Sequence, residues 1–142
     1  MRRNNYKEEK GMDYINRTPI GVKIPTEMLA SIDQMAYDLG IDRFEALNLF
    51  LLEATDEKKV RQMIYNRVSY LRRKNVFKYH SKFKDVTTVS FKMSYELYDK
   101  FYHIDKIYDS PGFSTLALRV AYESIYLKGI TETIIGRILD GR

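Results

Sequence analysis

The sequence contains no cysteine and only two histidines among its 142 residues. Without cysteine the chain cannot form disulfides, thiolate metal sites or a cysteine nucleophile. No apolar run approaches the roughly 18 residues that a membrane-spanning helix needs, and the first 16 residues lack the apolar core of a secretory signal. We therefore expect a soluble, cytoplasmic protein without a membrane partner.

Motifs that carry chemistry are missing as well. Neither His80 nor His103 has a second histidine or a carboxylate cluster at the spacing of metal ligands. The sequence has no phosphate-cradling glycine loop and no nucleophile elbow. We expect no catalytic residue, no metal and no cofactor, and we interpret the chain as a protein that is not an enzyme.

The composition favours a globular domain with an uneven distribution of charge. Apolar residues make up 44% of the chain and charged residues 30%, with twelve Tyr and seven Phe as packing material. Ten of the Lys and Arg residues lie between Thr55 and Asp85, together with three acids, although the net charge of the chain is only +5. Such a basic segment favours a polyanionic partner, and a solvated helix face would produce the same pattern.

The chain repeats one pattern in residues 18–54 and 87–126. Each copy begins with a segment in which apolar and polar residues alternate, which predicts a strand with one apolar face. The apolar positions are Ile20, Val22 and Ile24 in the first copy and Val89, Phe91 and Met93 in the second. A helix follows each strand, and we expect Thr26 and Ser94 to be the N-caps.

A glycine turn ends the first helix of each copy, at Gly40 and at Gly112. Glycine adopts the left-handed conformation that stops a helix. Asp42 and Ser114, each two residues after its glycine, are the expected N-caps of the second helices. The second copy is longer before this turn, and Ser110 and Pro111 account for the insertion.

This order of strand, helix, glycine turn and helix resembles the ribbon-helix-helix DNA-binding proteins of the Arc, MetJ and CopG type. The first copy matches through IGVKIPTEMLASIDQMAYDLGIDRFEAL, and the second through VSFKMSYELYDKF and GFSTLAL. The resemblance covers just over half of the chain. The tandem arrangement is also similar to small regulators carried by archaeal viruses and plasmids.

The resemblance implies a mainly α fold with a short antiparallel β-ribbon, built from two ribbon-helix-helix units. We expect the units to pair within one chain as a pseudo-dimer, and pairing between chains in a homo-oligomer is the alternative. The expected segments are a flexible N-terminal tail (1–16), a first unit (17–55), a basic bridging helix with an extended arm (56–86), a second unit (87–128), and a C-terminal short helix or tail (129–142).

In this family the outer face of the ribbon enters the major groove of double-stranded DNA, and the starts of the second helices clamp phosphates. Outward side chains of the two predicted strands are the expected base contacts: Arg17, Lys23, Thr88, Ser90 and Lys92. The starts of the second helices supply the expected phosphate contacts: Asp42, Arg43, Ser114 and Thr115. The negative charge of the Asp42 carboxylate would repel a phosphate. If that carboxylate is occupied in capping the helix, the backbone amides of Arg43 and its neighbours remain available to the phosphate.

The segment between the copies has two interpretations. Residues 56–75 have a helical apolar stripe, which predicts a bridging helix that could add phosphate contacts. Residues 76–85 interleave aromatic and basic side chains, which is typical of an extended arm, a single-strand-binding surface or a lysine-guarded edge strand. The accessory phosphate contacts would be Arg72, Arg73, Lys74, Lys78, Lys82 and Lys84.

These patterns together predict sequence-specific binding of double-stranded DNA by a transcriptional regulator, most simply a repressor. Two alternatives remain open. One is an antitoxin-like protein that binds a partner protein and regulates its own gene. The other is a non-specific or single-strand nucleic-acid-binding protein that uses the basic middle segment.

Overall fold

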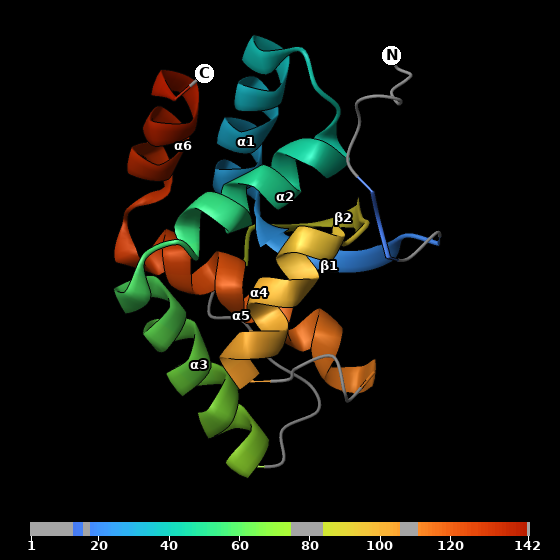
Figure 1. Cartoon of the computed structure of the whole chain (residues 1–142), viewed down its shortest axis with the longest axis vertical. Helices are drawn as coiled ribbons and strands as arrows, with labels where there is room; N and C mark the ends of the chain where they lie inside the picture. The colour runs from blue at the N-terminus through green and yellow to red at the C-terminus, as the bar shows by residue number, and fades with distance from the viewer. Residues whose placement is uncertain (1–12, 16–17, 75–83, 106–110, 142) are drawn as a thin grey trace.

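A computed structural model of the chain describes residues 13–15, 18–74, 84–105 and 111–141, and for 102–105 and 111–114 it describes only the backbone. This part of the chain forms six helices and two strands in the order β1 (Ile20–Pro25), α1 (Thr26–Leu39), α2 (Arg43–Ala54), α3 (Lys58–Arg73), β2 (Val86–Phe91), α4 (Tyr95–Asp105), α5 (Pro111–Lys128) and α6 (Thr131–Asp140). The fold is therefore mainly helical, as the sequence predicts (Figure 1).

The two strands pair with each other in an antiparallel ribbon within the one chain. Gly21 lies opposite Ser90, and Val22 lies opposite Val89. The alternation seen in the sequence is also the alternation of burial, because Val22, Val89 and Phe91 are buried while Gly21 and Ser90 are exposed. The predicted short antiparallel ribbon with one apolar face is confirmed.

The predicted turn between α1 and α2 is also confirmed. Gly40 has φ of 68° and lies in the left-handed region, and its N–H donates to the carbonyl of Tyr37. The N–H of Ile41 donates to the carbonyl of Ala36, which completes the hydrogen bonds that end α1. Asp42 then caps α2, since its Oδ1 accepts from the N–H of Glu45 at 2.9 Å.

The predicted caps differ between the two strand–helix junctions. Ser94 caps α4 as expected, because its Oγ accepts from the N–H of Leu97 at 3.1 Å. The prediction that Thr26 caps α1 is wrong: Pro25 is the N-cap, and Thr26 is already helical. The Thr26 hydroxyl instead hydrogen-bonds to the hydroxyl of Thr87 at 2.8 Å, and its N–H donates to the carbonyl of Asp85 at 3.0 Å. The neighbouring strand thus supplies the partners for this junction.

The predicted start of the second helix in the second copy is wrong as well. Helix α5 begins at Pro111, three residues before Ser114. Gly112 is therefore the second residue of this helix, and Ser114 is the fourth. Proline suits the first helical position, because its φ is already helical and because an N–H at that position would have no partner within the helix. Gly112 therefore does not form the turn that ends the first helix of the second copy, and Ser114 is not the N-cap of the second helix.

Helices α3 and α6 pack on helices that lie far from them in the sequence or do not directly precede them. Helix α3 follows α2 in the sequence but packs on α5 and α4, whereas α6 follows α5 and packs on α1 and α2 (Figure 1). Two side-chain hydrogen bonds support the placement of α6: Ser31 Oγ donates to Glu132 Oε2 at 2.7 Å, and Arg137 donates to Glu57 Oε2 at 3.3 Å. Helix α6 therefore closes the surface of α1 and α2, and α3 that of α4 and α5.

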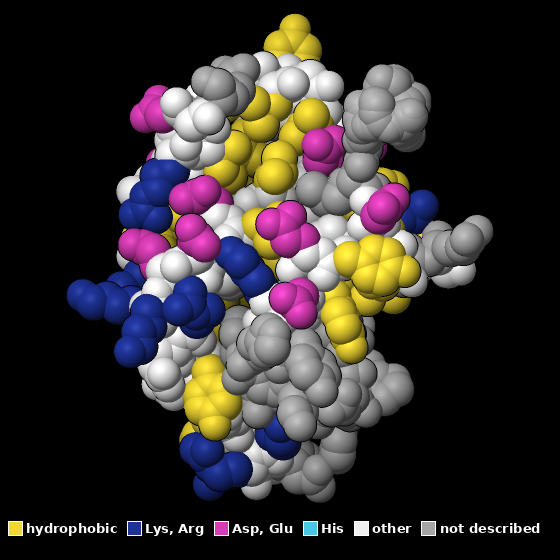
Figure 2. All heavy atoms as spheres, viewed as in Figure 1, with side chains coloured by type: hydrophobic (Ala, Val, Ile, Leu, Met, Phe, Trp, Pro, Cys, Tyr) yellow, Lys and Arg dark blue, Asp and Glu magenta, His cyan; other side chains and the backbone are white. Residues whose placement is uncertain are grey.

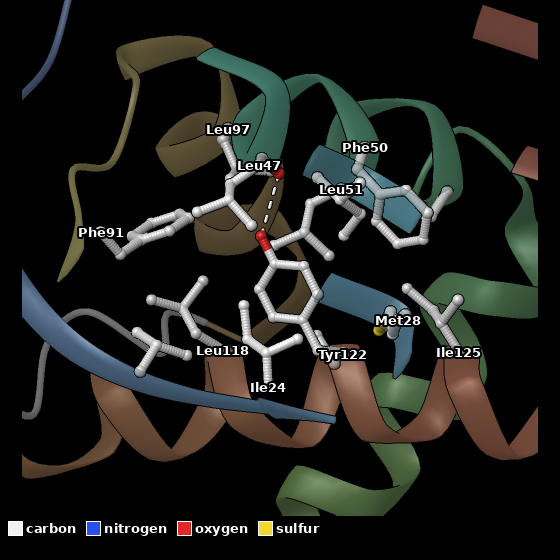
Figure 3. Close-up of a cluster of buried hydrophobic side chains, with 14 of the residues drawn as sticks. Ile24, Met28, Leu47, Phe50, Leu51, Phe91, Leu97, Leu118, Tyr122 and Ile125 are labelled. Carbon is white, nitrogen blue, oxygen red and sulfur yellow. Dashed lines mark hydrogen bonds between the residues drawn. The ribbon is translucent and has the colours of Figure 1, made fainter. Parts of the chain in front are cut away.

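The centre of the core lies where α2 meets α5. The rings of Phe50 and Tyr122 are stacked with their centroids 6.1 Å apart, and both side chains are fully buried. The Tyr122 hydroxyl donates to the carbonyl of Leu47 at 2.9 Å, so its polar end has a partner inside the core (Figure 3). Ile24 of β1 and Phe91 of β2 belong to the same buried cluster, which fixes the ribbon to the helices.

Candidate nucleic-acid interface

The outer face of the ribbon carries the side chains that the sequence placed outward. Lys23, Thr88 and Ser90 are exposed, and Lys23 lies directly opposite Thr88 across the ribbon. Gly21, opposite Ser90, leaves the middle of this face without a bulky side chain. The face therefore offers one ammonium group and two hydroxyls at neighbouring positions, with a flat centre between them.

The backbone of Gly21 lies close to the side chain of Thr88. A Cβ built there would lie 3.3 Å from Cγ2 of Thr88, which is a tight contact. A small side chain at Gly21 would therefore press on Thr88 and change the shape of the outer face. Because Ser and Thr hydroxyls can donate and accept, and Lys can donate to guanine acceptors, the flat face has the chemistry needed for contacts with base edges.

Lys92 lies at the end of this face and is held against the helices. Its side chain is only partly exposed, and its ammonium nitrogen lies 5.2 Å from the centroid of the Phe44 ring in the first turn of α2. This is a cation–π contact. Lys92, which we expected to be a base contact equivalent to Lys23, therefore has a structural partner that Lys23 lacks within the described residues.

A short segment before β1 closes the same end of the ribbon. Tyr14 forms an isolated bridge with Ser94, the N–H of Ile15 donates to the carbonyl of Met93 at 2.8 Å, and the N–H of Tyr95 donates to the carbonyl of Asp13 at 3.2 Å. The Tyr14 ring meets the Phe44 ring edge-on at 6.2 Å. Residues 13–15 show no alternation of their own, so the sequence pattern does not predict this contact.

Burial shifts the acid–base behaviour of Tyr14. Desolvation raises the pKa of its phenol well above the ordinary value, and the carboxylates of Asp42 and Glu45 raise it further. These two acids lie at the start of α2, beside Phe44. Two carboxylates at the start of α2 therefore lie close enough to Tyr14 to disfavour its phenolate.

The predicted phosphate contact at Arg43 already has an intramolecular partner. Its guanidinium donates two hydrogen bonds to the carboxylate of Asp33, at 2.9 and 2.7 Å, and this pairing raises the pKa of Arg43. The side chain is 48% exposed, so its outer edge still faces solvent. A phosphate at this helix start would share Arg43 with Asp33 and would meet the charge of Asp42.

The predicted phosphate contacts on the second copy have a different setting. Thr115 is partly buried, and the side chain of Ser114 lies outside the described atoms. Since α5 begins at Pro111, the backbone amides at its N-terminus belong to residues before Ser114. The two helix starts are therefore not equivalent, although the sequence copies suggested that they would be.

One buried polar residue that the sequence analysis overlooked fixes the ribbon to α2. The amide nitrogen of Asn48 donates to the carbonyls of Phe44 and Lys92, both at 2.7 Å, and its oxygen accepts from the N–H of Ser94 at 2.8 Å. Asn48 is fully buried. It joins α2 to the junction between β2 and α4 through a donor and an acceptor on one side chain.

The accessory basic residues lie on the surface where the structure describes them. Arg72, Arg73, Lys74 and Lys84 are exposed, whereas Arg17, Lys78 and Lys82 lie outside the described residues. Two cations lie over the ring of Tyr70: the guanidinium carbon of Arg67 is 5.5 Å from the ring centroid, and the ammonium nitrogen of Lys74 is 5.9 Å from it. Figure 2 shows Lys and Arg side chains gathered along one edge of the molecule, over α3 and its neighbours.

Within the described part of the chain no group of three or more His, Cys, Asp or Glu side chains is placed to hold a metal ion. His80 and the side chain of His103 are not among the described atoms. None of the helices in this part is long and apolar enough to span a bilayer.

Comparisons with models of protein families, with curated proteins and with solved structures find no match to this chain. Its function must therefore be argued from the geometry of its own surfaces.

Proposed function

We propose that the chain is a double-stranded-DNA-binding regulator that inserts the outer face of the β1–β2 ribbon into the major groove. The exposure of this face carries the proposal: Lys23, Thr88 and Ser90 point away from the core around the flat position of Gly21. The major groove is wide enough for a two-stranded ribbon and presents distinct donors and acceptors for each base pair.

We further propose that the two copies form an intramolecular ribbon-helix-helix pseudo-dimer. The order of elements supports this, because one strand followed by three helices occurs twice. The ribbon register supports it too: the offset that matches Lys23 with Lys92 also matches Gly21 with Ser90, and these two residues lie opposite each other. In a two-fold arrangement, residues near the axis meet their own equivalents.

The core supports the same arrangement. Phe50 lies in α2 and Tyr122 in α5, the second helices of the two copies, and their rings are stacked. The placement of α3 and α6 follows the same rule, because α3 packs on α4 and α5 of the second copy and α6 packs on α1 and α2 of the first copy. One chain would thus replace the homodimer of the related family, and its half-sites need not be identical.

A regulator of this kind acts simply by occupying its site, so repression is the simplest effect and no catalytic group is required. The cation–π contact of Lys92 favours unequal halves, because Lys23 and Lys92 are equivalent in the sequence but Lys23 is exposed while Lys92 is partly buried. We expect Lys23, Thr88 and Ser90 to carry most of the base contacts, and Lys92 to contribute less than its position in the sequence suggests.

The proposal is tested by comparing duplex and single-stranded DNA in anisotropy titrations at several salt concentrations. Binding to duplex should be tighter and should weaken linearly with salt on logarithmic axes, because phosphate contacts release counterions. The double variant Lys23→Ala, Ser90→Ala should lose about 1–3 kcal/mol of discrimination for each base contact removed. Lys128→Ala, which removes an exposed cation at the end of α5, is the matched control.

Equal or tighter binding to single strands would contradict insertion of the ribbon into a groove. So would a double variant that discriminates between sequences as well as the unchanged protein does.

A further inference from the structure

The charges of the two crossing helices differ sharply. Helix α3 has the sequence KKVRQMIYNRVSYLRR, with six Lys or Arg residues and no acid. Helix α6, which occupies the corresponding place on the other half, has the sequence TETIIGRILD, with one Arg and two acids. Both helices bury an apolar face against the opposite hairpin. The role of α6 shows that this packing needs no excess of positive charge.

The start of α3 carries two lysines that do not help the helix to form. Lys58 and Lys59 occupy its first turn and are exposed. Cations at a helix N-terminus meet the positive end of the helix dipole, so this placement is unfavourable for the helix itself. Arg72 and Arg73 in the last turn have the opposite relation to the dipole, and a structural role would be enough to explain them.

The acids nearest to these lysines are paired elsewhere. Asp56 accepts from Lys100 of α4 at 2.9 Å, and Glu57 accepts from Arg137 of α6 at 3.3 Å. Among the described residues, no carboxylate forms an ion pair with Lys58, Lys59 or Arg73. The other cations of the helical hairpins, such as Arg43 and Arg119, do have acidic partners. Lys58, Lys59 and Arg73 are therefore cations of α3 without an acidic partner among the described residues.

We propose that this face of α3, defined by Lys58, Lys59, Arg73 and Lys74, is a second DNA-contact surface that binds the phosphate backbone of double-stranded DNA without reading its sequence. It rests on the proposed function only for the class of ligand. The surface is separate from the ribbon, since α3 lies at the lower left of Figure 1 and the ribbon extends to the right. The helix is about 24 Å long, and lysines and arginines along such a length suit a row of phosphates.

The test compares Lys58→Gln, Lys59→Gln with the unchanged full chain, using a random-sequence duplex and a duplex that carries the preferred site. The double variant should bind both duplexes more weakly and by the same factor. Its plot of log affinity against log salt should be shallower by about 2, because each phosphate contact contributes about 0.9 to the slope. Its melting temperature should be unchanged or higher, since two cations leave the helix start.

Two control variants separate this surface from charge in general. Lys58→Arg, Lys59→Arg keeps both charges and should bind as the unchanged chain does. Lys128→Gln removes one exposed cation from the end of α5 and should leave the slope unchanged. A double Gln variant that keeps the original slope, or one that loses affinity only for the preferred site, would overturn the proposal.

The outcome also distinguishes this surface from the ribbon. If Lys23→Ala, Ser90→Ala lowers sequence discrimination while the α3 variant changes nothing, the ribbon reads DNA and the α3 proposal is wrong. If the α3 variant lowers affinity while the ribbon variant changes nothing, α3 binds DNA and the ribbon proposal is wrong. Tighter binding of the α3 surface to single-stranded RNA than to duplex DNA would also overturn it.

Discussion

Replacing Asn48 with Ala removes the side chain that joins α2 to the junction between β2 and α4. The N–H of Ser94 loses its acceptor inside the core, because Ser94 is only 1% exposed. The carbonyl of Lys92 loses its donor as well, although Lys92 is partly exposed and water can reach it more easily. The carbonyl of Phe44 lies within a helix and keeps other partners there.

The magnitude follows from these two groups. A buried polar group left without a partner costs about 1–3 kcal/mol. One fully buried N–H and one half-buried carbonyl therefore predict a loss of about 2–4 kcal/mol in the free energy of unfolding, which is a large part of the 5–15 kcal/mol of a typical domain. Asn48→Asp should also destabilise the protein at neutral pH, because a carboxylate can accept from Ser94 but cannot donate to Lys92.

Urea unfolding followed by far-ultraviolet circular dichroism measures this loss. Asn66→Ala is the matched control, since Asn66 is exposed on α3 and accepts only from Gln62 among its described contacts. It should change the free energy of unfolding by no more than about 0.5 kcal/mol. If Asn48→Ala costs less than about 1 kcal/mol, the three hydrogen bonds do not hold the ribbon junction as argued here.

Four further substitutions probe other parts of the fold. Gly40→Ala should destabilise the protein by about 1–2 kcal/mol because φ is positive there. Gly136→Ala should stabilise the protein by about 0.5–1 kcal/mol, because Gly136 lies inside α6 and an added Cβ would meet open space. Equal urea midpoints of the two variants would contradict both predictions. Tyr122→Phe should cost about 1 kcal/mol through the lost bond to Leu47, and an unchanged melting curve would show that this bond is dispensable. Because the pKa of Tyr14 is raised, its neutral form stabilises the folded state below about pH 10, and this stabilisation is lost as the pH rises further. In an ultraviolet titration, Tyr14→Phe and the unchanged chain should give the same phenolate signal until the folded protein opens. One more tyrosine titrating near pH 10 in the unchanged chain than in Tyr14→Phe would show that the pKa of Tyr14 is not raised.

The elements of the fold that depend on local pattern could be predicted from the sequence. The alternation in Ile20–Ile24 and Val89–Met93 predicted two strands and their inner faces, although β2 runs from Val86 to Phe91 and ends before Lys92 and Met93. Gly40 gave one helix end, and Asp42 and Ser94 gave two helix starts. In each case the determining interaction lies within a few residues in the chain. The local rules are therefore sufficient there.

The features that depend on distant partners could not be predicted. Thr26 resembles an N-cap, but a residue of the other strand takes its hydroxyl. Lys92 resembles Lys23, but the ring of Phe44 in α2 holds its ammonium group. The crossing of α3 and α6 is set by which hairpin each apolar stripe meets, and a stripe alone does not identify its partner.

The candidate site shows the same division. Exposure of Lys23, Thr88 and Ser90 follows from the strand alternation and could be predicted. The ion pair of Arg43 with Asp33 joins two helices of a hairpin and could not be read from composition. The uncompensated charge of Lys58 becomes visible only when the partners of Asp56 and Glu57 are known.

Selection of bound sites from a random duplex pool is the most direct test of the ribbon as the reading element. The unchanged chain should enrich one asymmetric sequence, because its two strands present different residues outward. The triple variant Lys23→Ala, Thr88→Ala, Ser90→Ala should still bind duplex but should enrich no defined sequence. Enrichment of the same sequence by the triple variant, or no enrichment by the unchanged chain, would contradict the assignment of the ribbon as the DNA-reading surface.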